Sequence, residues 1–128
     1  MSKEVVVLSA VRSPIGAFGG SLADMDPCDL GGIVMKEAIA RSSVDPKQIN
    51  YVTVGTTMPV DSRYAYVSRV ASIQAGLPMD SVAMQVSRLC ASGLQAIVTT
   101  AQNIMLGDAE YGIGGGVEVM SKVAYLMP

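Results

Sequence analysis

The sequence lacks histidine and tryptophan, has a single phenylalanine, and contains only two cysteines among its 128 residues. Without histidine, the chain has no side chain of the type that most often serves as a general base. Two cysteines far apart do not indicate a disulfide framework, and we expect the protein to be in the reducing cytoplasm. The net charge is −2 and no cluster of lysine and arginine is present, which argues against binding to nucleic acid or to an anionic membrane.

Charged residues are also scarce, at 16% of the chain, where a soluble domain usually has roughly 25%. Hydrophobic residues make up 50%, including nine methionines. A domain of this length exposes much of its surface, so the shortage of charge predicts that a partner covers part of it. Lys3 and Glu4 precede only a short apolar stretch, which is neither a signal peptide nor a membrane span.

Apolar runs alternate with helical segments along the whole chain. Strands are predicted at residues 5–8, 51–55, 81–86 and 111–115, and helices at residues 27–41, 63–75 and 91–106. Asp26 before Pro27 is a helix N-cap followed by proline at the first helical position, and Gly76 and Gly107 end the second and third helices. The order βαβαβαβ predicts an α/β fold with a mostly parallel sheet covered by helices.

The third predicted helix, residues 91–106, carries no charged residue. An ordinary surface helix has one apolar stripe and one charged face, so this helix is expected to pack against two layers. The single sheet of this chain covers one side only. Missing sequence or another subunit would then cover the other side. The alternative is a plain helix with a weakly polar outer face of threonine and glutamine.

Cys90 lies where the third predicted strand turns into the third helix. A helix N-terminus carries unpaired N–H groups and the positive end of the helix dipole, which favour a thiolate and suit a nucleophile. The alternative is a buried structural cysteine, because free cysteine is among the most buried residue types. The local sequence leaves both interpretations open.

Four stretches of the chain carry motifs in a fixed order. They read RSPIGAFGG at residues 12–20, RVA to AGLP at residues 69–78, LCASGLQA at residues 89–96 and GGGVEVMS at residues 114–121. In order and spacing they resemble the motifs of the N-terminal part of a thiolase. The third resembles the nucleophile motif of that family, Cys-Gly/Ala-Ser-Gly-Leu-x-Ala, and the fourth resembles its Gly-Gly-x-Glu-x-Met-Ser.

The resemblance implies that residues 1–128 are the N-terminal core domain of a thiolase, ending near the start of the expected loop domain. It also implies that the fold is incomplete without a second, similar half. Cys90 is then the nucleophile that accepts an acyl group from acyl-CoA, for Claisen condensation or for thiolysis of a 3-ketoacyl-CoA. CoA thioesters are the substrates, and no cofactor or metal is required.

The chain departs from the thiolase pattern in the groups that assist the nucleophile. In the family, a histidine and a second cysteine of the C-terminal half, with a water held by asparagine, complete the site. Cys28 lies near the first predicted helix, in a region without a catalytic role in the family, so the role of the second cysteine is not assigned to it. Ser87 stands where relatives often have asparagine, and Val119 where serine is usual.

Other residues of the motifs have two interpretations each. Gly93, Gly115 and Gly116 let backbone approach the substrate, or they serve packing and turn geometry. Glu118 orients the turn after the last strand, or it accepts hydrogen bonds from backbone donors at a helix start, which we favour. Arg12 contacts a phosphate, or it caps carbonyl groups at a strand end, which we also favour.

Two functional classes follow from the resemblance. In the first, the chain is part of an acyltransferase that acts on acyl-CoA and CoA and is active only when the missing elements are supplied. It is then expected to form a homo-oligomer or a complex with a C-terminal thiolase polypeptide. In the second, the chain is a truncated, catalytically incompetent thiolase fragment that acts as a structural or interaction module. The complete N-terminal motifs favour the first class, and the absence of a general base favours the second for the chain alone.

Overall fold

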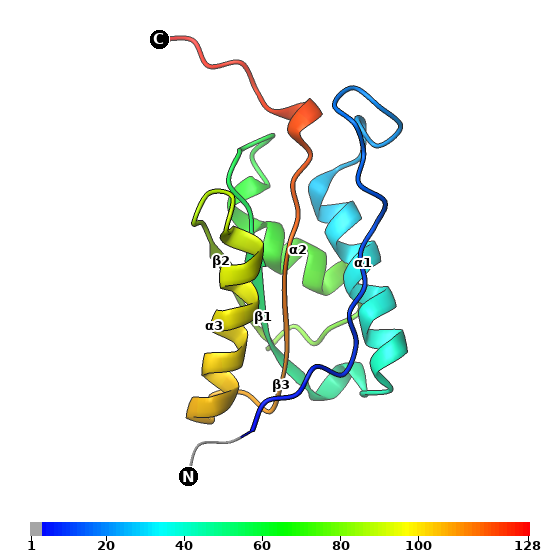
Figure 1. Ribbon diagram of the computed structural model, residues 1–128, viewed down its shortest axis with the longest axis vertical. Coiled ribbons are helices and arrows are strands. Elements are labelled where there is room, and N and C mark those ends of the chain that lie inside the picture. Colours follow the sequence, from blue (N-terminus) through cyan, green and yellow to red (C-terminus); the bar gives the residue numbers. More distant parts are fainter. Residues whose placement is uncertain (1–3) are drawn as a thin grey trace.

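The computed structural model describes residues 4–128, so Lys3 lies outside the described residues. It contains a three-stranded parallel sheet in the order β2-β1-β3, with helices on both faces. Helix α3 covers one face, while α2 covers the other and packs against α1 (Figure 1). The helices and strands are α1 (Pro27–Ser42), β1 (Ile49–Gly55), α2 (Val67–Gln74), β2 (Val82–Val86), α3 (Ser92–Leu106) and β3 (Tyr111–Gly116). The predicted α/β class with a parallel sheet is confirmed.

The predicted first strand, residues 5–8, is wrong. This segment has no regular structure, and its side chains Val6, Val7 and Leu8 are exposed. It runs close to α1, where the Ser9 hydroxyl donates a hydrogen bond of 2.7 Å to the Ala38 carbonyl (Figure 1). A β-branched run forms a strand only where a neighbouring strand supplies the ladder and where other layers cover its side chains. The sheet therefore has three strands in the described chain, and the element order is αβαβαβ.

The helix ends follow the local sequence. The Asp26 side chain caps α1 by accepting a hydrogen bond of 2.8 Å from the Cys28 N–H, with Pro27 in the first turn. Gly76 and Gly107 follow α2 and α3 with φ of 92° and 89°, values that glycine adopts without strain. The predicted helix over residues 63–75 is divided into a short 3₁₀ turn, Tyr64–Tyr66, and α2.

The core lies between the sheet and the α1/α2 layer. Val52, Val54, Val67 and Ala71 are at most 2% exposed there, and Cys28 is 1% exposed. On the other side of the molecule, α3 leaves a set of apolar side chains between 42% and 78% exposed: Leu94, Ile97, Val98, Met105 and Leu106. No helix within the described chain has both the length and the hydrophobicity to cross a bilayer.

Candidate active site

Cys90 lies in the sharp turn that leads from β2 into α3, and its side chain is exposed. The turn is closed by two backbone hydrogen bonds, from the Ala91 N–H to the Arg88 carbonyl and from the Ser92 N–H to the Leu89 carbonyl, both 3.1 Å. Leu89 has a φ of 51°, the left-handed region that non-glycine residues rarely occupy. The exposure of Cys90 contradicts a structural role in the core of this domain.

The Ser92 side chain stabilises the same turn. Its hydroxyl accepts a hydrogen bond of 2.8 Å from the Arg88 N–H and donates one of 2.6 Å to the Leu89 carbonyl. Thr57, from the loop after β1, places its hydroxyl 3.3 Å from the Ser92 hydroxyl and donates to the Leu89 carbonyl at 3.4 Å. Neither residue is predicted from the sequence to take part in the site, although Ser92 is part of the motif around Cys90.

Glycines let the N-terminal end of α3 rest directly on the strands. A Cβ at Gly55 would overlap the carbonyl group of Ser92 and lie 2.7 Å from the Gly93 nitrogen. A Cβ at Gly116 would lie 3.1 Å from the Gly93 Cα. The packing role is therefore confirmed for Gly116, whereas Gly115 faces open space. Gly55, which is not predicted from the sequence to have this role, makes the tightest of these approaches.

Glu118 binds the loop that follows β1. Its carboxylate accepts hydrogen bonds from the Thr57 N–H at 2.9 Å, from the Met58 N–H at 3.0 Å and from the Thr56 hydroxyl at 3.2 Å. The favoured role, at a helix start, is wrong. Glu118 lies in the turn after β3, and its hydrogen bonds hold that turn against the loop after β1, which agrees with the other predicted role. The prediction of backbone donors as its partners is right, but they lie about 60 residues away in sequence.

Two other ionisable side chains differ in burial, since Tyr64 is half-buried and Arg12 is exposed. Burial raises the pKa of Tyr64, and the Glu118 carboxylate raises it further. Arg12 is exposed and donates a hydrogen bond of 3.1 Å to the Ser13 carbonyl, so it does cap a carbonyl, although in a loop and not at a strand end.

The two cysteines differ in accessibility, and one of them is a very weak acid. Cys28 is 1% exposed, and burial raises the pKa of its thiol to about 11, with a further contribution from the Asp26 carboxylate. We therefore expect Cys90 to be alkylated first. At pH 7 a pKa of about 11 leaves roughly one Cys28 thiol in 10⁴ ionised, so iodoacetamide should modify Cys90 at least about 100-fold faster.

Pulse alkylation followed by peptide mapping checks this order. Far-ultraviolet circular dichroism serves as the control that the protein is folded. Equal labelling rates of the two cysteines in the folded protein would contradict the assignment of Cys90 as the accessible thiol.

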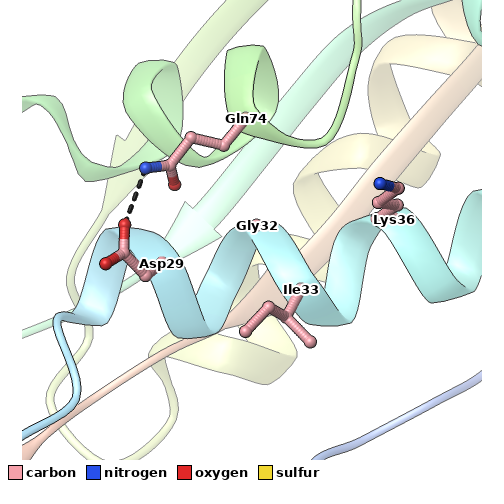
Figure 2. A pocket seen from close by; sticks show the side chains of 5 residues that line it. All are labelled: Asp29, Gly32, Ile33, Lys36 and Gln74. Carbon is pink, nitrogen blue, oxygen red and sulfur yellow. Dashed lines mark hydrogen bonds between the residues drawn. The ribbon is translucent and has the colours of Figure 1, made fainter.

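A hollow of about 260 Å³ lies elsewhere, on the outer surface between α1 and α2. Figure 2 shows its lining, where the Gln74 side-chain amide donates a hydrogen bond of 2.7 Å to the Asp29 carboxylate. This volume is below the roughly 300 Å³ at which ligand pockets usually begin. Its lining does not include the Cys90 turn, and within residues 4–128 no cluster of three or more His, Cys, Asp or Glu could hold a metal ion. A second hollow of about 510 Å³ lies at the opposite end of the sheet from Cys90, and its lining includes Asn50, Gly107 and Glu110. The candidate site at the carboxyl end of the sheet therefore rests on the Cys90 turn and not on a pocket.

The fold and the site define a class of protein: a parallel α/β domain with an exposed cysteine at a strand-to-helix turn, at the carboxyl end of the sheet. The family model described as "Thiolase, N-terminal domain" matches residues 5–128. The chain belongs to the thiolase family, as its motifs predict.

Curated relatives match the chain over nearly all of its length. Beta-ketothiolase BktB of Cupriavidus necator is 48% identical over 128 residues, which are 100% of this chain and 32% of that protein. The mitochondrial 3-ketoacyl-CoA thiolase of Bos taurus is 36% identical over 121 residues, 94% of this chain and 30% of that protein. The chain thus spans about a third of the length of these relatives.

Solved structures show the same fold. Human mitochondrial 3-ketoacyl-CoA thiolase in complex with CoA superimposes with a TM-score of 0.91 at 35% identity, over 94% of this chain and 30% of that chain. The acetyl-CoA acetyltransferase of Syntrophomonas wolfei gives a TM-score of 0.89 at 38% identity, over 99% of this chain and 32% of that chain.

Proposed function

We propose that the chain supplies the nucleophile of a thiolase reaction. The Cys90 sulfur attacks the carbonyl carbon of an acyl-CoA, the CoA thiolate leaves, and the acyl group stays on the sulfur as a thioester. The α-carbon of a second acyl-CoA, after losing a proton, attacks that acyl group, which releases Cys90 and forms a 3-ketoacyl-CoA. Thiolysis is the same sequence in reverse. The observation that carries the proposal is the exposed Cys90 at its turn, in a chain of the thiolase family.

The chemistry of the first step fits the residues at the turn. A thioester exchanges readily with a thiolate of similar basicity, so no cofactor or metal is needed. The N–H groups of Ala91 and Ser92 are already bonded to carbonyl groups of the turn. The backbone N–H of Cys90 itself is therefore our proposed donor to the oxyanion that develops during attack.

The second step needs groups from outside residues 1–128. The chain has no histidine, and Cys28 is too buried and too weakly acidic to exchange protons at the site. We propose that a C-terminal thiolase half or polypeptide provides the general base, and that acyl-CoA and CoA are the substrates. The exposed apolar face of α3 supports such a partner, and it equally supports the second class of function, an interaction module without catalysis.

Residues 1–128 alone should accept an acetyl group but should not produce acetoacetyl-CoA. Positioned acid–base groups contribute about 10²–10⁴-fold, and without them the carbon acid is not deprotonated at a useful rate. Intact mass spectrometry after incubation with acetyl-CoA should show at most one acetyl adduct. A coupled assay should detect turnover only after a C-terminal thiolase polypeptide is added.

Two outcomes would contradict this prediction. Robust condensation by residues 1–128 alone would mean that another group serves as the base. No acetyl adduct on Cys90, with or without the C-terminal polypeptide, would favour the interaction module.

A further inference from the structure

The Glu118 carboxylate joins two loops at the carboxyl end of the sheet. It lies just beyond β3 and receives all its hydrogen bonds from residues 56–58, directly after β1. No cationic side chain lies within 4.0 Å of the Glu118 carboxylate in the described chain, so this carboxylate is not held by an ion pair. Hydrogen bonds to an ionised acceptor are about twice as strong as neutral ones. The carboxylate therefore fixes the position of this loop.

The loop in turn supports the turn that carries Cys90. The Thr57 N–H donates to Glu118, while the Thr57 hydroxyl reaches the Leu89 carbonyl and the Ser92 hydroxyl. Leu89 occupies left-handed backbone geometry, which persists only when surrounding contacts hold it. The hydroxyl groups of Thr57 and Ser92 both bind the Leu89 carbonyl, so they hold the residue directly before Cys90.

We infer that Glu118 is a positioning residue for Cys90, acting through Thr57 on the turn at residues 88–92. The inference rests on the proposed role of Cys90 as the acyl acceptor. Attack on a thioester requires the sulfur and the Cys90 N–H to face one carbonyl group together, whereas alkylation requires only an exposed thiolate. Loosening the turn should therefore slow acylation much more than alkylation.

The test compares Glu118→Gln with Glu110→Gln, in the full polypeptide as its gene encodes it. Glu110 is an exposed residue directly before β3, at the opposite end of the strand, so it loses the same charge away from the site. The side-chain amide that Glu118→Gln introduces would direct N–H groups at backbone N–H donors, which breaks at least one of the three hydrogen bonds. A misplacement of about 1 Å costs on the order of 10²-fold, and a loosened turn misplaces the sulfur by less, so we expect acetylation of Cys90 by acetyl-CoA to slow about 10-fold.

Alkylation and hydrogen exchange separate positioning from stability. Iodoacetamide should alkylate Cys90 in Glu118→Gln within about 2-fold of the parent rate, with Cys28 still protected. Backbone amides of Thr57 and Met58, and those of Ala91 and Ser92, should exchange faster in Glu118→Gln and not in Glu110→Gln. Equal acetylation in the two variants, or unchanged exchange at residues 91 and 92, would overturn the inference.

Thr57→Val tests the residue that connects Glu118 to the turn at residues 88–92. It removes the hydroxyl and keeps the backbone N–H of residue 57 bonded to Glu118. The rate of Cys90 acetylation should fall as in Glu118→Gln, and backbone amide hydrogen exchange should become faster at residues 91 and 92 only. If Glu118→Gln does not fold, the acetylation rate and the hydrogen exchange of Thr57→Val test the inference in its place. If the parent protein is not acetylated at all, the proposed function fails, and hydrogen exchange still decides whether Glu118 holds the turn.

Discussion

Replacing Cys90 with alanine is expected to abolish acyl transfer, assayed with the C-terminal thiolase half or polypeptide present. The substitution removes the only exposed thiol of the described chain, because Cys28 is buried in the core. Covalent nucleophiles are not replaced by neighbouring water, so turnover should fall by at least about 10³-fold. The measurement is the rate of CoA release from acetyl-CoA, together with the mass of the protein after incubation.

The other cysteine provides the matched control. Cys28→Ala should keep the acetyl adduct and the turnover, with a loss of stability on the order of 1–2 kcal/mol from the lost buried sulfur. Circular dichroism confirms that both variants are folded. A Cys90→Ala protein that still forms the adduct, or still turns over near the parent rate, would exclude Cys90 as the acyl acceptor.

Replacing Gly55 with alanine is expected to disrupt the site without touching the nucleophile. A methyl group at this position would overlap the backbone of Ser92 and Gly93, which no side-chain rotation can relieve. Overpacking usually costs about 1–3 kcal/mol, and a contact with backbone belongs at the upper end, about 3 kcal/mol or more. Urea unfolding measures the loss, and acetylation of Cys90 should fall because the N-terminal end of α3 must move.

Gly115→Ala is the control on the neighbouring strand. A Cβ there meets no atom within 4 Å, and its φ is not positive. We expect a stability change within about 0.5 kcal/mol. If Gly55→Ala and Gly115→Ala unfold at the same urea concentration, the close approach of β1 and α3 does not determine the site.

The elements that the sequence predicted well are those with local signals. Asp26 and Pro27 mark the start of α1, and Gly76 and Gly107 mark the ends of α2 and α3, because capping depends on residues next to each other in sequence. The turn that exposes Cys90 lies between a predicted strand and a predicted helix for the same reason.

The features that the sequence did not predict depend on distant partners. Residues 5–8 have the composition of a strand, but strand formation needs a neighbouring strand, and composition does not report one. Glu118 was assigned to the wrong donors because its true partners lie about 60 residues away. Gly55 gave no signal either, since a glycine at a strand end shows its purpose only when α3 is packed against it.

The acyl-enzyme itself gives the most direct test of Cys90 as the nucleophile. The full polypeptide is mixed with acetyl-CoA, quenched in acid, digested and analysed by peptide mass spectrometry. A single acetyl group on the peptide that contains Cys90, lost again when free CoA is added before quenching, is the expected result. Condensation that proceeds with Cys90 unmodified, or with the acetyl group on another residue, would contradict it.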